Sequence, residues 1–292
     1  MKKAFLQLHA AIFLAGFTGV LGRLISLNEA LLVWYRMMFA ALTLFLIALI
    51  SKKIPKLSLK SSFSLIGIGG IIALHWVFFY GSIKYANVSV SLVCFSAIGF
   101  FSVLLDPIIS KRKFEWIELL LGLMVMIGIS LMFHFDPHFR TGILFGMISS
   151  FLAALFPILN KKMMSLHQPE TITLFEIAGG FFVLTLILPV YLSFSPVSNL
   201  MPSLSDFGWL LILSLLCTVL AFNLSVRSLS KISPFTVNLS FNLEPVYGIA
   251  LAFLIFKEYN EVGISFYIGM LIIFLTVVLQ TIRVYRQASI KL

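Results

Sequence analysis

Charged residues are scarce in this sequence of 292 residues. The 21 Lys and Arg and the 11 Asp and Glu make up only 11% of the chain, whereas 60% is hydrophobic. An average soluble domain carries about 25% charged residues, so this chain lacks the polar surface that would cover a core in water. An intrinsically disordered chain is excluded because such chains are polar and charged. The composition therefore predicts an integral membrane protein in contact with the lipid bilayer.

Cysteine and proline are also sparse. The two cysteines, Cys94 and Cys217, lie within apolar runs, so the sequence predicts neither a disulfide framework nor a metal site. Thirty Phe and only 10 Pro, without strict alternation of polar and apolar residues, favour lipid-facing helices over the strands of a β-barrel. The net charge of +10 comes from basic clusters between apolar runs, which indicates membrane topology rather than nucleic-acid binding.

Apolar runs of roughly the 20 residues that one membrane span needs follow one another along the chain. They cover residues 5–22, 30–50, 63–82, 88–110, 116–134, 141–160, 171–194, 207–226, 235–256 and 262–282. Lys2 and Lys3 precede the first run, but no clear small-x-small cleavage site follows it, so we expect a retained helix rather than a signal peptide. The sequence thus predicts an all-α integral membrane protein with ten transmembrane helices.

The distribution of basic residues supports this count. With the N-terminus in the cytoplasm, sixteen Lys and Arg fall on the cytoplasmic side, four fall on the outer side, and Arg36 lies within a helix. Cytoplasmic loops of membrane proteins carry such an excess, and one missed span would reverse every later loop. We therefore expect a multi-pass protein of the inner (plasma) membrane with both termini cytoplasmic.

A weak internal repeat accompanies the ten runs. A shift of 144 residues places 88–89 on 232–233, and a shift of 140 residues places 34–36 on 174–176. The hydropathy pattern shows two sets of five spans with long loops at similar places. Because five is odd, the second set enters the membrane upside down, as in the inverted repeats of many secondary transporters. We expect one five-helix repeat in residues 1–136 and the other in 137–292.

A local motif lies in the ninth run. Residues 242–247 read Asn-Leu-Glu-Pro-Val-Tyr, and the following apolar stretch ends in Phe256-Lys257-Glu258. Together with ten helices in two halves, this resembles the EamA branch of the drug/metabolite transporter superfamily, in which a Leu-x-Pro segment precedes an apolar stretch and Gly-Glu. Lys257 replaces that Gly here, and Gly99-Phe100-Phe101 occupies the stretch of the first half that would hold the proline. The resemblance implies export or exchange of small metabolites, amino acids among them, without a bound cofactor.

Several acidic or basic side chains lie inside apolar runs, where such groups usually face a cavity or a partner, and three of them are candidates for the site. Arg36 and Glu176 are related by the repeat: Arg36 could bind a substrate carboxylate, and Glu176 could bind an amine or a coupling proton. Alternatively, each could reach its own membrane surface or form a structural pair. Glu244 lies near the middle of the ninth run, beside Pro245, which is expected to kink the helix and frees a backbone carbonyl. Glu244 could line a midplane site or carry the coupling proton, or it could be a polar contact that packs the helix.

Aromatic and amide side chains complete the predicted site. His75 lies near the middle of the third run with Phe79 on its face, although a lone histidine is more often structural. In the family that this chain resembles, exporters of aromatic amino acids line their cavity with aromatic and histidine side chains of the third helix. Asn238 and Asn242 form a polar stripe in the ninth run. The predicted substrate-binding residues are Arg36, His75, Phe79, Glu176, Asn238, Asn242 and Glu244, and no catalytic or metal-binding residue is predicted.

These features predict a secondary transporter, an exporter or exchanger of small metabolites such as amino acids, that works by alternating access and could be coupled to protons. ATP is not the expected energy source, because no phosphate-binding loop of the G-x-x-x-x-G-K-[ST] type occurs. The absence of H-E-x-x-H and G-x-S-x-G motifs argues against a membrane-embedded enzyme. A channel or a structural membrane subunit is the remaining alternative.

Overall fold

The computed structural model describes residues 2–52, 57–133, 139–197 and 199–290, and all regular secondary structure in these residues is helical. Seven helical segments are long and apolar enough to cross a membrane. They are α1 (Lys2–Leu24), α2 (Glu29–Ile50), α3 (Leu59–Tyr85), Val88–Ser110, α7 (Arg140–Met163), α8 (Pro169–Phe194) and Leu204–Ser228. Shorter apolar segments lie in α6 (Trp116–Phe133), α12 (Glu244–Phe256) and α13 (Ile264–Ile290). The all-helical class is confirmed, while the count of ten spans stays a prediction.

Three of the long helical segments are interrupted. A break at Ser96 and Ala97 separates α4 (Val88–Phe95) from α5 (Ile98–Ser110). A π-helical turn, η2 (Leu215–Leu220), joins α9 (Leu204–Ser214) to α10 (Ala221–Ser228), and a 3₁₀ turn, η3 (Phe241–Leu243), joins α11 (Pro234–Ser240) to α12. Pro245 stands in the first turn of α12, where its missing N–H costs nothing. Only this third break was predicted from the sequence.

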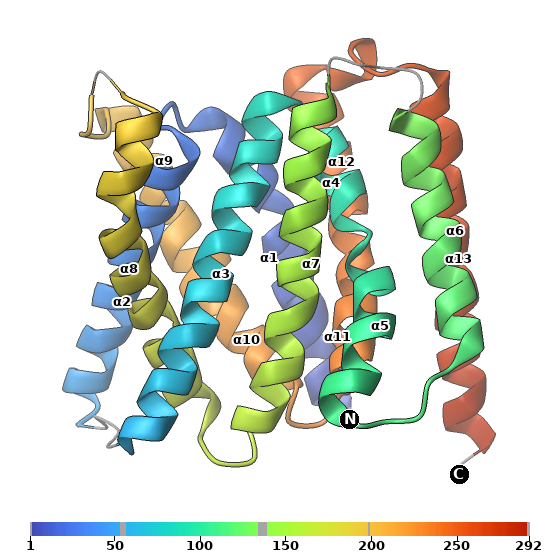
Figure 1. Cartoon of the computed structure of the whole chain (residues 1–292), viewed down its shortest axis with the longest axis horizontal. Helices are drawn as coiled ribbons and strands as arrows, with labels where there is room; N and C mark the ends of the chain where they lie inside the picture. Colours follow the sequence, from blue (N-terminus) through green and yellow to red (C-terminus); the bar gives the residue numbers. More distant parts are fainter. Residues whose placement is uncertain (1, 53–56, 134–138, 198, 291–292) are drawn as a thin grey trace.

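The helices stand side by side in one bundle, and α1 begins at the end where α13 finishes (Figure 1). Most basic residues of the described chain lie in or next to the helix ends found here: Lys2, Lys3, Lys52, Lys60, Lys111, Arg112, Lys113, Lys161, Lys162, Arg227, Lys231 and Arg283. The opposite end holds Arg23, Lys84, Arg140 and Lys257. The loops that are rich in Lys and Arg in the sequence therefore lie together at one end of the bundle.

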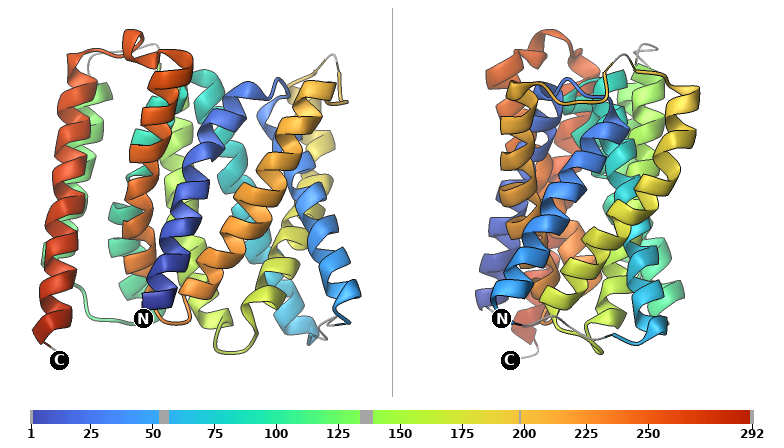
Figure 2. Two further views of the ribbon diagram at one scale, coloured as in Figure 1. Left: turned by 180° about the vertical axis from the view of Figure 1, so that it is seen from behind. Right: turned by 90° about the vertical axis from the view of Figure 1, so that its left-hand side faces the viewer.

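Helix contacts follow a two-fold pattern. In this pattern α1 corresponds to α7, α3 to α10, α4 to α11 and α5 to α12. The contact of α3 with α7 then corresponds to that of α10 with α1, and the contact of α4 with α12 corresponds to that of α11 with α5. The pairs α2–α8 and α6–α13 correspond to themselves, and α6 and α13 lie together at one side of the bundle (Figure 2). In Figure 1, α7 runs opposite to α1. The two halves are thus arranged as an inverted repeat would be.

Helix ends define the register of the repeat. Lys111 after α5 and Lys257 after α12 both adopt the left-handed conformation, with φ of 54° and 57°. Asn87 accepts a hydrogen bond from the N–H of Val90 at the start of α4, and Ser233 accepts one from the N–H of Thr236 at the start of α11. One shift of 146 residues relates both pairs. The sequence-based shift of 144 for this span was wrong by two residues, because apolar segments match by chance in several registers.

A close crossing of α3 and α8 fixes the position of α3. A Cβ atom on Gly69 would lie 2.1 Å from the carbonyl oxygen of Glu176, and one on Gly180 would lie 2.5 Å from the carbonyl oxygen of Gly69. Small residues let helix backbones approach this closely in membrane proteins. The crossing holds α3 against the second half of the chain, and α3 carries two of the predicted site residues, His75 and Phe79.

Candidate functional site

A cavity of about 80 Å³ lies between the two halves of the bundle. Five of the seven predicted site residues line it: Arg36, His75, Phe79, Asn238 and Glu244. Its volume is that of two or three water molecules at about 30 Å³ each, whereas sites for drug-sized ligands span roughly 300–1,000 Å³. A ligand of more than a few heavy atoms therefore needs this cavity to widen.

Arg36 is the most strongly held of these residues, although its side chain is only 2% exposed. Its Nε donates to the Thr218 hydroxyl (2.7 Å), one terminal nitrogen donates to the Tyr80 hydroxyl (2.8 Å), and the other donates to the Cys217 carbonyl (3.3 Å). The guanidinium carbon lies 3.7 Å from the centre of a Trp76 ring, a cation–π contact. Neutral groups thus position this charge, and three of the five N–H donors of the guanidinium are used.

The π-helical turn η2 supplies two of the groups that hold Arg36. Such a turn pairs residues five apart rather than four, and the Thr218 hydroxyl donates to the carbonyl of Leu213 (2.9 Å), five residues earlier. The Cys217 carbonyl accepts from Arg36. Turns of this kind occur frequently at functional sites. The apolar string Leu215–Leu220 carries no sequence signal for it, so Thr218 and Cys217 were missed.

Glu244 faces the same cavity from the second half. It is 5% exposed, begins α12, and has no hydrogen-bond partner in the part of the chain that the structure describes. Arg36 is the other charged residue among the described residues of the cavity wall. The two groups do not form an ion pair among the described contacts. A buried cation and a buried acid therefore line one cavity without touching.

His75 is oriented by Ser149 on α7. Its Nδ1 lies 3.0 Å from the Ser149 carbonyl oxygen and 2.8 Å from the Ser149 hydroxyl, which donates to the His75 carbonyl (3.1 Å). A carbonyl can only accept, so Nδ1 carries the hydrogen and Nε2 is the ring nitrogen available to a ligand. Phe95 stacks on the imidazole at 5.7 Å between ring centres, and Phe156 lies at 6.0 Å. Both rings line the cavity and were missed, because thirty Phe residues give no means of choosing among them.

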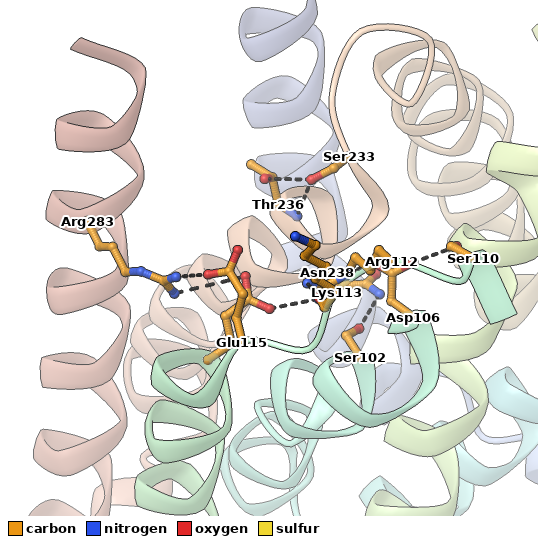
Figure 3. A network of polar contacts seen from close by, with 11 residues as sticks. Ser102, Asp106, Ser110, Arg112, Lys113, Glu115, Ser233, Thr236, Asn238 and Arg283 are labelled. Carbon is orange, nitrogen blue, oxygen red and sulfur yellow. Dashed lines mark hydrogen bonds and ion pairs between the residues drawn. The ribbon is translucent and has the colours of Figure 1, made fainter. Parts of the chain in front are cut away.

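Asn238 ties the second half to the first near the end of the bundle that is rich in basic residues. Its side-chain amide donates to the Ser102 hydroxyl (2.5 Å) and the Ala154 carbonyl (3.3 Å), while its own amide oxygen has no partner. Figure 3 shows this contact beside Asp106, which accepts from Arg112 at 2.7 Å. Asp106 therefore lies near the end of α5 in a salt bridge with Arg112.

Glu176 is not among the described residues that line the cavity. Glu176 is fully buried and accepts a hydrogen bond from Asn160 at 3.1 Å, so it lies in a pair that joins α8 to α7. The second carboxyl oxygen of Glu176 and the amide oxygen of Asn160 have no partner. The repeat therefore relates Arg36 to a residue with different surroundings. The side chain of Asn242 lies outside the described part of the structure.

At the end opposite the chain termini, buried contacts join the two halves. Glu258 is fully buried and accepts from the N–H groups of Val88 (3.1 Å) and Ser89 (2.8 Å), so it caps the start of α4. Arg23 forms an ion pair with the same carboxylate. The residue 146 positions before Glu258 is Arg112, which instead pairs with acids of its own half. The repeat thus differs at its two ends, and only this end has such an acidic cap among the described residues.

Comparison with known proteins agrees with the two related halves and the helical fold described above. The model of the EamA-like transporter family matches residues 2–134 and 140–282. A solved crystal structure has the same fold, with a TM-score of 0.68 over 98% of this chain and 99% of that chain, at 14% sequence identity. Similarity at that level shows the fold alone. The predicted boundary between 136 and 137 lies outside the described residues and stays a prediction.

Two similar proteins are transporters. One is an uncharacterized transporter of Haemophilus influenzae, 24% identical over 162 residues, which are 52% of this chain and 53% of that protein. The other is GDP-fucose transporter 1 of Dictyostelium discoideum, 26% identical over 142 residues, which are 46% of this chain and 39% of that protein. The matched region spans about half the length of these relatives or less. The family match and both relatives support a multi-pass membrane transporter.

Proposed function

The chain belongs to the EamA-like transporter family, and on that premise we propose that it is a secondary transporter, an exporter or exchanger of small metabolites. The observation that carries this proposal is the cavity between the halves, into which Arg36, His75 and Glu244 bring polar groups that are otherwise buried. Polar and ionisable groups inside a membrane protein usually mark a substrate or ion pathway. Amino acids and other small carboxylates are the candidates, because Arg36 suits a carboxylate and an ionised Glu244 would suit an amine.

Alternating access would be a movement of one half against the other around this cavity. The described structure supports a state closed at the end where Glu258 caps α4, because buried contacts join the halves there. We propose that this is the outer end, that the end rich in basic residues is cytoplasmic, and that the chain spans the inner membrane ten times with both termini inside.

The test is thermal unfolding of the detergent-purified protein with a panel of amino acids, carboxylates, nucleotide sugars and organic cations. A ligand that binds only the folded state raises the melting temperature by mass action. We expect at least one member to do so in the unmodified protein and to lose its effect in Arg36→Gln. Arg140→Gln, an exposed residue at the start of α7, is the matched control and should respond like the unmodified protein.

A shift that survives in Arg36→Gln would contradict the assignment of the site. A channel or structural subunit is the second candidate function. It would be favoured by unsaturable leak, or by no flux at all, after reconstitution into liposomes. A membrane-embedded enzyme is opposed by the two relatives, both of which are transporters.

A further inference from the structure

The charges that face the cavity are few and can be counted element by element. Arg36 comes from α2, His75 from α3, Cys217 from η2 and Glu244 from α12, while α1 contributes Ala11, Ala15 and Thr18 and α11 contributes Asn238. Tyr80 on α3 contacts Arg36 through its hydroxyl group. With His75 and the Cys217 thiol neutral, the described lining of the cavity has one fixed positive charge and one acid that can balance it.

Arg36 requires a counter-charge. A guanidinium stays protonated in proteins, and a buried ion is costly unless it is paired. Its described contacts are a hydroxyl, a phenol, a carbonyl and an aromatic ring, none of which carries a negative charge. Two N–H donors are not used by these contacts. A buried cation with donors to spare on the wall of a cavity is a binding site for an anionic group.

Among the described residues that line this cavity, Glu244 is the one acid. Neither Arg36 nor any other described residue is bonded to its carboxyl group. When it is ionised, it balances Arg36 across the cavity, and a bound anion would then add a second negative charge to a space of about 80 Å³. Like charges this close in a medium of low dielectric constant repel strongly. When Glu244 is protonated, a bound anion alone balances Arg36.

We propose that the cavity binds a ligand whose anionic group, a carboxylate or a phosphate, contacts Arg36, and that the anion-bound form carries one proton on Glu244. For a singly charged anion the charges balance: the anion, a proton and a site with ionised Glu244 give a site with Arg36, the anion and neutral Glu244, and the net charge is zero before and after. Within a transport cycle, which rests on the proposed function, this would make transport of the anion proton-coupled. A zwitterion differs, because its amine could pair with ionised Glu244.

The test measures anion binding to the purified protein by titration calorimetry between pH 6 and pH 9.5. The probes are pyruvate, phenylpyruvate, alanine, and sulfate, which has the shape of a phosphate group and does not titrate in this range. We expect Kd for at least one anion to be constant at the acid end and to rise tenfold per pH unit above the titration of Glu244. In that upper range, buffers of different ionisation enthalpy should show uptake approaching one proton per anion.

Isosteric variants assign the proton. Glu244→Gln should bind the same anion with a Kd that does not change with pH and equals the acid-end value of the unmodified protein. Glu176→Gln removes a carboxyl group that is equally buried but does not line the cavity, and it should keep the pH dependence. Arg36→Gln should lose anion binding, with its thermal unfolding recorded to show that it folds.

Several outcomes would overturn the inference. A pH dependence that persists in Glu244→Gln would assign the proton to His75 or Cys217, and one lost in Glu176→Gln would assign it to the pair on α7 and α8. Binding of alanine alone, without proton uptake, would overturn both the anion site at Arg36 and the coupled proton on Glu244. It would leave the proposal of a transporter of zwitterions. If no anion binds, the anion site is wrong, whereas the proposed function fails only if reconstituted protein transports nothing.

Discussion

At the residue scale, ionisable side chains within apolar runs were the informative signal. Arg36, His75 and Glu244 were chosen because charge and polarity are costly inside a bilayer, and the structure places all three on one cavity. The same reasoning chose Glu176, which lies in a separate pair with Asn160. The free-energy cost of burying a polar group in the membrane shows that the group needs a partner. It does not show whether that partner is a substrate or a neighbouring helix.

Thr218→Val tests whether η2 holds Arg36 in place. The substitution keeps the shape of the side chain but leaves the Nε donor of Arg36 buried without its acceptor. An unpaired buried donor costs about 1–3 kcal/mol, so the melting temperature should fall. Thr185→Val removes the hydroxyl that accepts from Trp34 at an exposed position and should cost less. Equal losses in the two variants would contradict a special role for Thr218.

At the element scale, apolar runs located the helices to within a few residues but not their interruptions. A proline predicts a break, so the one beside Pro245 was expected, whereas the turn at Leu215–Leu220 and the break at Ser96 and Ala97 occur in apolar sequence. The groups that stabilise them, such as the Arg36 guanidinium that donates to the Cys217 carbonyl, come from distant helices. The local sequence therefore does not predict such contacts.

Gly69→Ala tests the crossing of α3 and α8. The added Cβ would meet the backbone oxygen of Glu176 at 2.1 Å, and backbone cannot move aside without separating the helices. We expect a loss of about 1–3 kcal/mol, as for other overpacked sites, measured as a lower melting temperature. Gly67→Ala on the same helix has nothing within 4 Å of the new Cβ and should be neutral or slightly stabilising. A neutral Gly69→Ala would mean that the helices do not cross so closely.

Glu258→Gln tests the cap on α4. The carboxylate accepts two backbone N–H bonds and pairs with Arg23, and hydrogen bonds to charged groups contribute about 1.5–3 kcal/mol each. The variant should unfold at a lower temperature and bind ligands with altered affinity if the cap stabilises one conformation. Glu261→Gln, whose side chain is 41% exposed, is the control. An effect of Glu261→Gln as large as that of Glu258→Gln would argue against the cap.

At the scale of the whole molecule, composition and the distribution of basic residues predicted a helical membrane protein in two related halves. The family match over both halves and the two-fold pattern of helix contacts agree with that prediction. The register of the repeat was wrong by two residues in the span 88–110, since only the caps at Asn87, Ser233, Lys111 and Lys257 define it. Ligand identity is not encoded at this scale, because it depends on a few side chains within one cavity.

The central claim is that the cavity at Arg36 is the site of transport, and solute counterflow tests it most directly. Liposomes that contain the protein are loaded with an unlabelled ligand found in the thermal panel, and entry of the labelled ligand is followed. We predict transient, saturable accumulation with the unmodified protein and with Arg140→Gln, and none with Arg36→Gln of the same folded content. Accumulation that is unchanged in Arg36→Gln would contradict the claim.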